Sequence, residues 1–157
     1  FILIIGVFKI VKSKISKKDM FKDIKINIEG KEVQVKAMVD TGNMLKEPIS
    51  GKPVIVVEHT LLYDILPKEI LNNLEKILGG DIESLPDEIK NKYISKLKFI
   101  PFSSLGKQNG MLIGIKPTYV EVMQEENTKK EDVIIGIYNK SFTKNGEYRA
   151  LIGIDLI

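Results

Sequence analysis

The sequence predicts a mainly β domain with a helical insertion in its middle. Short apolar runs with strand-like alternation occupy both sides of the 157-residue chain, whereas residues 67–97 carry apolar side chains at helical spacing. Hydrophobic residues make up 43% and charged residues 29%, which is the composition of a globular protein that can bury a core. A chain of this length is expected to form one domain.

The first twenty residues differ from the rest of the chain. Residues 1–8 are almost wholly apolar, and five lysines follow between residues 9 and 18. Eight residues cannot cross a bilayer, which takes about 20. An apolar end that leads into lysines is nevertheless typical of the cytoplasmic exit of a membrane helix. We interpret residues 1–20 as the end of a membrane segment with a basic linker, and residues 21–157 as the folded domain. The alternative is a first core element followed by a basic linker.

A β-hairpin is predicted at the start of the domain. Residues 24–28 and 33–39 alternate apolar and polar side chains on either side of a turn at Gly30. The second strand leads directly into Asp40. After a loop that contains Pro48 and Gly51, the apolar run over residues 53–57 predicts a buried strand.

Two helices are predicted in the middle of the chain. The first begins near Pro67 and stops at Gly79–Gly80, with apolar side chains at positions 70, 71, 74, 77 and 78. Ser84 and Asp87 resemble a capping box for the second helix, whose apolar positions are 89, 93 and 97. Both helices are expected to cover a sheet.

Strands are predicted again after residue 97. Apolar runs over residues 98–102 and 111–115 flank a polar turn at residues 103–110, and three further strands are expected over residues 119–123, 133–138 and 148–152. The last strand ends at Gly153.

Composition limits the possible chemistry. The chain has no cysteine, which excludes disulfides, thiol catalysis and cysteine-ligated metals. Its single histidine, His59, excludes a two-histidine metal site and disfavours a Ser-His-Asp triad. We therefore expect no metal and no cofactor. The 24 basic and 21 acidic residues alternate without a basic, aromatic-rich stripe, so nucleic acid is not an expected partner.

The most informative motif is a carboxylate at the end of an apolar strand. Asp40 follows an apolar tripeptide directly and precedes Thr41, Gly42 and Asn43. A buried carboxylate is costly unless it is hydrogen-bonded or protonated. Thr41 offers a hydroxyl to the backbone, and Gly42 permits a sharp turn and a close approach. These four residues are predicted to form a rigid loop that presents a catalytic carboxylate; a plain β-turn is the alternative.

The Asp-Thr-Gly motif suits an enzyme that uses two aspartates. Two carboxylates that share one proton can divide the work, since one acts as general base on a water while the other polarises the scissile carbonyl. The motif occurs once in this chain. If the chain is an aspartic protease, two chains must each supply an Asp40 across a two-fold axis.

Two further segments resemble retroviral-type aspartic proteases. In that family an apolar-apolar-Gly segment packs beside the catalytic loop, and Leu151, Ile152 and Gly153 match it. A hairpin stands where the family has its substrate-covering flap, although the helical insertion separates it further from the catalytic loop. The resemblance implies a retropepsin-like half-barrel that forms a two-fold homodimer. The flap candidates are Ser103, Ser104, Leu105, Gly106 and Gly110.

A narrower resemblance is to the sporulation sigma-E factor-processing peptidases of endospore-forming bacteria. Asn43 is distinctive, because retroviral and cellular relatives usually carry Ala or Ser at that position. The resemblance covers roughly residues 21–154. It is carried by residues 38–45, 47–54, 100–106, 110–112, 115–117 and 150–153.

That resemblance implies a membrane-embedded N-terminal half and a protease domain on the cytoplasmic, mother-cell face of the cell membrane. The implied substrate is a sigma-factor precursor cut near its N-terminus, and a signalling protein from the forespore side is the implied trigger. Two alternatives stay open. One is a non-catalytic retropepsin-like module for dimerisation or regulation, and the other is a monomeric membrane-tethered sensor whose Asp40 carboxylates never meet.

Overall fold

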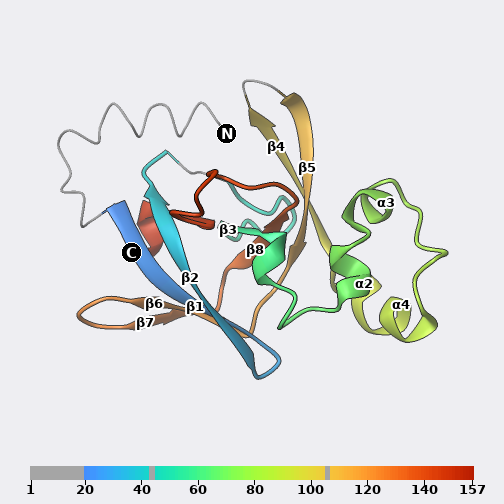
Figure 1. Ribbon diagram of the computed structural model, residues 1–157, viewed down its shortest axis with the longest axis horizontal. Helices are drawn as coiled ribbons and strands as arrows, with labels where there is room; N and C mark the ends of the chain where they lie inside the picture. Colours follow the sequence, from blue (N-terminus) through green and yellow to red (C-terminus); the bar gives the residue numbers. More distant parts are fainter. Residues whose placement is uncertain (1–19, 43–44, 105–106) are drawn as a thin grey trace.

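The computed structural model describes residues 20–42, 45–104 and 107–157. One nine-stranded mixed sheet forms the body of the described chain, and the helices gather at one side of it (Figure 1). The mainly β class with a helical insertion is therefore confirmed. The predicted membrane exit at residues 1–8 and the lysines that follow lie outside the described residues. In the described part, no helix is long and apolar enough to cross a membrane.

The predicted N-terminal hairpin is present. β1 (Phe21–Ile28) and β2 (Lys31–Asp40) pair antiparallel over all of β1, with Phe21 opposite Met38 and Ile28 opposite Lys31. The turn between them places Glu29 and Gly30 at positive φ, 52° and 84°, the region that glycine tolerates best. β3 (Val54–Glu58) follows the loop after β2 and is buried at every residue. These three strands bring Asp40 and Glu58, two acidic residues, to strand ends inside the protein.

The helical insertion is more broken than the sequence predicts. The single helix expected from Pro67 to Leu78 is wrong, because α2 (Lys68–Leu71) and α3 (Leu74–Leu78) are separate. The Asn73 side chain donates a hydrogen bond to the Glu69 carbonyl, 2.7 Å away. In a continuous helix that carbonyl would accept from the Asn73 backbone, so the side chain competes with the helix.

The second predicted helix is also shorter than expected. α4 (Asp87–Tyr93) ends in a 3-10 turn, η4 (Ile94–Lys96), and the other 3-10 turns are η3 (His59–Leu61) and η5 (Ile154–Leu156). The capping box predicted at Ser84 is wrong, because Pro86 occupies the cap position and makes no side-chain hydrogen bond there.

The second half of the chain supplies the remaining strands. Polar residues pair in the β4–β5 hairpin, so both strands reach further toward the tip than the apolar pattern predicts. β7 lies between two of the predicted strands, in a segment for which no strand is predicted, and there the Lys129 ammonium stands 4.4 Å from the centre of the Tyr119 ring. The strands are β4 (Lys98–Ser104), β5 (Lys107–Ile115), β6 (Tyr119–Met123), β7 (Thr128–Lys130), β8 (Ile134–Tyr138) and β9 (Ala150–Gly153).

The strand order is β4-β5-β8-β3-β9-β2-β1-β6-β7. β9 lies between two strands from the first half of the chain, parallel to β2 and antiparallel to β3. β3 is parallel to β8. The end of the described chain thus fills the centre of the sheet and lies next to the strand that carries Asp40.

Each face of the sheet buries its own apolar cluster. The larger cluster joins the sheet to the helices and includes Val39, Ile135 and Ile152. The second cluster, on the opposite face, contains Met38, Val56 and Leu151. Alternation along each strand separates the two sets, as it must in a sheet with two buried faces. The second cluster consists of Met20, Met38, Val54, Val56, Ile100, Leu112, Ile134, Tyr148 and Leu151.

Packing on the second face leaves no room for a side chain at Gly114. A Cβ there would lie 2.5 Å from Ile100 Cδ1 and 2.9 Å from Ile134 Cγ2, while the cross-strand partner is also a glycine, Gly136. Gly114→Ala is expected to lower the free energy of unfolding by about 1–3 kcal/mol, the usual cost of overpacking. Urea denaturation measures the change.

Gly79→Ala is the matched control, since a Cβ there meets only backbone atoms at 3.6 Å, an ordinary contact distance. The packing account is wrong if the two variants unfold at the same urea concentration.

Candidate active site

Asp40 is the last residue of β2, and its side chain is fully buried. It follows Met38 by two positions and therefore points to the same face of the sheet, the face of the second apolar cluster. Thr41 and Gly42 form the turn directly after it and are half-buried. The predicted loop residue Asn43 lies outside the described residues.

The two carboxylate oxygens of Asp40 differ in their surroundings. Oδ1 accepts a hydrogen bond from the Gly42 backbone N–H at 3.0 Å. Oδ2 is buried and has no hydrogen-bond partner among the described residues. A buried polar atom without a partner costs about 1–3 kcal/mol, and more when it is charged, so it requires an explanation.

Burial raises the pKa of Asp40 above its ordinary value, and the hydrogen bond from Gly42 opposes this effect in part. A raised pKa favours the protonated carboxyl, which carries a proton that can be donated. Perturbed carboxyl groups of this kind concentrate at catalytic sites.

Leu151, Ile152 and Gly153 lie on β9, directly beside the strand that carries Asp40. The parallel register pairs Met38 with Leu151 and Asp40 with Gly153. All four residues of β9 are buried. Gly153 therefore leaves space next to the carboxylate where any larger residue would place a side chain.

The β4–β5 hairpin contains the described flap candidates. In Figure 1 it rises beyond the rest of the sheet, on the side toward which β2 also runs. Ser103 and Ser104 are the last residues of β4, while Gly110 lies on β5. Leu105 and Gly106, at the tip, lie outside the described residues. The hairpin shares the second apolar cluster with Met38 and Leu151 through Ile100 and Leu112.

One cross-strand pair of the hairpin places an aromatic residue opposite a glycine. Gly110 pairs with Phe102, and a Cβ on Gly110 would lie only 2.3 Å from Phe102 Cζ. The aromatic ring thus lies over the glycine. A pocket of about 310 Å³ at this point is lined by Pro101, Phe102, Ser103, Gly110 and Met111.

Comparison with models of known protein families shows to which family the chain belongs. The model of the family described as sporulation factor SpoIIGA matches residues 1–156, nearly the whole chain. The chain belongs to the SpoIIGA family. No solved structure shows a significant match to it.

Curated relatives of the SpoIIGA family carry peptidase names. The chain is 27% identical over 142 residues to the sporulation sigma-E factor-processing peptidase of Priestia megaterium, which covers 88% of this chain and 45% of the relative. It is 27% identical over 133 residues to the protein of the same name from Bacillus subtilis, covering 82% of this chain and 42% of the relative. The chain thus spans less than half the length of both relatives.

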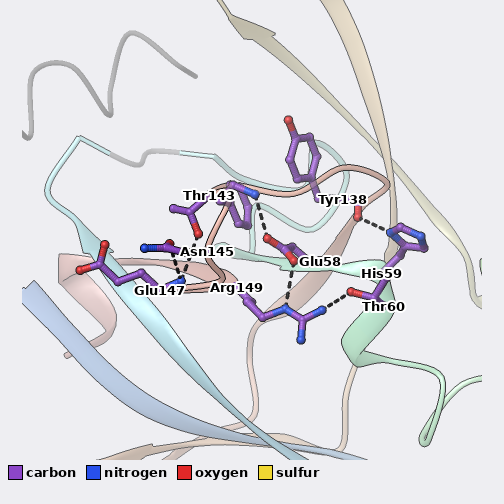
Figure 2. A network of polar contacts seen from close by, with 9 residues as sticks. Glu58, His59, Thr60, Tyr138, Thr143, Asn145, Glu147 and Arg149 are labelled. Atoms are coloured by element: carbon purple, nitrogen blue, oxygen red, sulfur yellow. Dashed lines mark hydrogen bonds and ion pairs between the residues drawn. The ribbon is translucent and has the colours of Figure 1, made fainter.

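Sequence reasoning missed two further buried acids among the described residues of this SpoIIGA-family chain. Glu47 is 1% exposed, and its carboxylate accepts hydrogen bonds from the backbone N–H groups of Ile49 and Ser50. Glu58, the last residue of β3, is 3% exposed and pairs with Arg149 (Figure 2). The signal was available, because Glu58 also follows an apolar strand directly.

Tyr148 is buried in the second apolar cluster, together with Met38 from the strand that carries Asp40. The Nδ1 atom of His59 lies 3.2 Å from the carbonyl oxygen of Tyr138.

The described residues of the SpoIIGA-family chain offer no cluster of three His, Cys, Asp or Glu side chains for a metal ion. Of the titratable groups that the structure describes, Asp40 is the best placed for chemistry, since it combines burial, a raised pKa and an oxygen without a partner among those residues.

The raised pKa of Asp40 has a measurable effect on stability. The folded chain holds the proton more tightly than the unfolded chain. Below the ordinary pKa of 3.8 the carboxyl is protonated in both states and costs no stability. As pH rises through the raised pKa of the folded state, the buried carboxyl must ionise and folding becomes less favourable. Asp40→Asn removes the charge. The variant is expected to be more stable than the wild type at pH 7, with the difference shrinking toward acid pH. Thermal unfolding of the monomeric chain across this pH range measures it.

Asp23→Asn is the control, because Asp23 is an exposed residue on β1. A stability difference for Asp40→Asn that does not change with pH would contradict the assignment of a raised pKa to this carboxyl.

Proposed function

We propose that the chain is the catalytic domain of an aspartic endopeptidase that removes the N-terminal pro-sequence of a sporulation sigma-factor precursor. The active site is a pair of Asp40 carboxylates, one from each of two chains. The observation that carries this proposal is the fully buried Asp40 whose Oδ2 has no partner among the described residues.

The Asp40 of a second chain would supply the hydrogen-bond partner that the buried Oδ2 lacks among the described residues, and so remove the energetic cost of burying it unpaired. Two carboxyl groups about 3 Å apart cannot both ionise, so they share one proton and hydrogen-bond to each other. The buried Oδ2 of each chain then gains a partner that a single chain does not provide. A raised pKa in the isolated domain favours the same outcome, because one of the two groups must stay protonated.

The neighbours of Asp40 suit such a pair. The hydrogen bond from Gly42 holds Oδ1 and leaves Oδ2 for the second chain or a water. Gly153 opposite Asp40 lets another backbone approach closely. Thr41, Gly42 and Gly153 are therefore assigned to supporting the loop, and Asn43, the next residue in sequence, is assigned to the same loop.

The reaction follows from the shared proton. The ionised Asp40 takes a proton from a water, which attacks the scissile carbonyl carbon. The protonated Asp40 of the other chain donates a hydrogen bond to the carbonyl oxygen and supports the charge that develops there. A proton then passes to the leaving nitrogen, and the peptide bond breaks. Because the pair titrates as a unit, the pH dependence of catalysis belongs to both carboxyls.

The substrate assignment rests on the relatives. Proteins named sporulation sigma-E factor-processing peptidase match this chain over more than four fifths of its length. Since these relatives are more than twice as long, we assign the remainder of their length to a membrane-embedded half and place this domain on the cytoplasmic, mother-cell face. The lysines between residues 9 and 18 agree with that side of the membrane. A signalling protein from the forespore side is the proposed trigger.

The β4–β5 hairpin is proposed as the flap that covers the substrate. It is long and stands beyond the sheet at the side toward which β2 runs (Figure 1). Phe102, which pairs with Gly110, packs against the second apolar cluster, on the face to which Asp40 also points. A flap that excludes water would strengthen the electrostatic interactions at the carboxyl pair.

The role of Asp40 is tested by co-expressing the full-length protein with a sigma-factor precursor. Asp40→Asn keeps the size of the side chain but can neither accept a proton from water nor share one. We expect cleavage to fall by at least about a thousandfold, the scale seen when a catalytic group is removed from a protease. Immunoblotting of precursor and product measures the change.

Asp155→Asn is the matched control, because Asp155 is exposed and lies two residues after Gly153, close to the same site in sequence. It should cleave at the wild-type rate. Normal precursor cleavage by Asp40→Asn would exclude the protease assignment and favour a non-catalytic dimerisation or regulatory module.

A further inference from the structure

A pocket of about 440 Å³ lies where the β1–β2 turn meets η4, the start of β4 and the link between β5 and β6. One of its lining residues, Ile28, pairs with Lys31, the first residue of β2, whereas Asp40 is the last. A strand of ten residues spans roughly 30 Å at about 3.3 Å per residue. In Figure 1 the β1–β2 turn points downward, away from the end of β2. The proposed reaction therefore does not use this pocket.

Basic side chains predominate among the charged residues of the pocket. Lys96, Lys98 and Lys116 contribute three ammonium groups, and Glu29 contributes one carboxylate. Glu29 lies 3.4 Å from the Lys96 ammonium. Lys116 is exposed and forms no ion pair within the described part of the chain. The pocket thus carries positive charge that this part of the chain does not neutralise, and it suits an anionic ligand.

Glu29 holds an unusual backbone conformation at the edge of the pocket. Both turn residues have positive φ, 52° at Glu29 and 84° at Gly30, and Asn, Asp or Gly is the usual choice in the place of Glu29. Its carboxylate pairs with Lys92 at 3.1 Å and with Lys96 at 3.4 Å. Conformations of this kind concentrate at functional sites. Glu29 thus acts as an internal carboxylate that already occupies two of the lysines beside the pocket.

Backbone contacts fix the wall of the pocket. The Glu29 N–H donates to Thr118 Oγ1 at 3.1 Å, and the Thr118 N–H donates to the Asn27 carbonyl at 2.8 Å. Three buried apolar residues complete the lining: Ile28, Ile115 and Pro117. A small inorganic anion does not need such an apolar lining, whereas a peptide with both acidic and apolar side chains uses both kinds of surface.

The position of the pocket favours a protein ligand over a membrane lipid. The predicted basic linker joins β1 at Phe21, which pairs with Met38 near Asp40, and the pocket lies at the other end of β1. It therefore lies far from the point at which the proposed tether enters the domain. The proposed substrate is a whole protein, so it has segments remote from the bond that is cut, and contacts with such segments add binding energy.

We propose that this pocket is a docking site for an acidic segment of the sigma-factor precursor, with Lys116 contacting a carboxylate of that segment and the apolar lining taking a neighbouring aliphatic side chain. The identity of the partner rests on the proposed function. The inference adds a second contact region, remote from Asp40, through which the protease recognises its substrate.

The first test measures peptide binding to the full-length protein in detergent by fluorescence anisotropy. The probe is a labelled peptide that alternates glutamate and leucine, and the same peptide with lysine in place of glutamate is the control ligand. Lys116→Glu is expected to weaken binding about fivefold, because an attraction becomes a repulsion. Glu29→Gln should tighten binding about twofold, since the carboxylate that competes for Lys92 and Lys96 is removed.

Lys68→Glu is the matched control, because it reverses the charge of an exposed lysine on α2, outside the pocket. It should bind the acidic peptide as the wild type does. The proposal requires opposite shifts in Lys116→Glu and Glu29→Gln, and any other pattern overturns it. Glycerophosphate represents a lipid headgroup. If it binds in a Lys116-dependent way while the acidic peptide does not bind, the pocket takes a phosphate group and the proposal is wrong.

The second test compares two substrates of the full-length protein. For the whole precursor, Lys116→Glu should raise KM about fivefold and leave kcat unchanged, because it removes a contact made equally in the bound state and the transition state. For a short peptide that spans only the cut bond, neither constant should change. An equal rise in KM for both substrates would place the effect at the catalytic site and contradict a separate docking site.

The two measurements separate this inference from the proposed function. If cleavage depends on Asp40 but Lys116→Glu changes neither peptide binding nor KM for the precursor, the proposed function stands and the docking site is wrong. If the acidic peptide binds in a Lys116-dependent way but no Asp40-dependent cleavage occurs, the proposed function fails, and with it the assignment of the precursor as the partner.

Discussion

The parallel pairing of β9 with β2 is the contact on which the rest of the structure depends. It places Gly153 opposite Asp40 and buries the carboxylate among strands from both halves of the chain. It also brings the 139–149 loop, which ends at β9, to the same face of the sheet. Without this pairing Asp40 would be an acid at an exposed strand end, with no reason for a raised pKa.

Two of the buried acids, Asp40 and Glu58, show how hydrogen bonding separates a structural role from a reactive one. Glu58 has a partner for each oxygen, the Arg149 guanidinium and the Phe142 N–H, so its charge is compensated inside the protein. Among the described residues Asp40 has one partner for its two oxygens, and burial raises its pKa. Each is the last residue of its strand and directly follows apolar residues. Their contacts, and not their positions in sequence, make one an anchor and the other a candidate for chemistry.

The sequence predicts most strands and the position of Asp40, because alternation and strand ends are local signals. It fails where particular side-chain or cross-strand contacts override the apolar pattern. The Asn73 side chain breaks the predicted helix through a bond to Glu69, and polar residues near the tip extend the β4–β5 hairpin by pairing across it. The sequence does not predict the contacts of Glu58 either, since its partners lie 84 and 91 residues away along the chain.

The central claim is that each chain supplies half of one active site. Mixing full-length wild type with Asp40→Asn, under conditions in which subunits exchange freely, tests it most directly. If both Asp40 residues of a pair are required, equal amounts of the two chains leave about one quarter of the activity per total protein, because only pairs of wild-type chains are active. If one chain carries a complete site, about one half remains. The account predicts the quarter, and a linear decline to one half would contradict it.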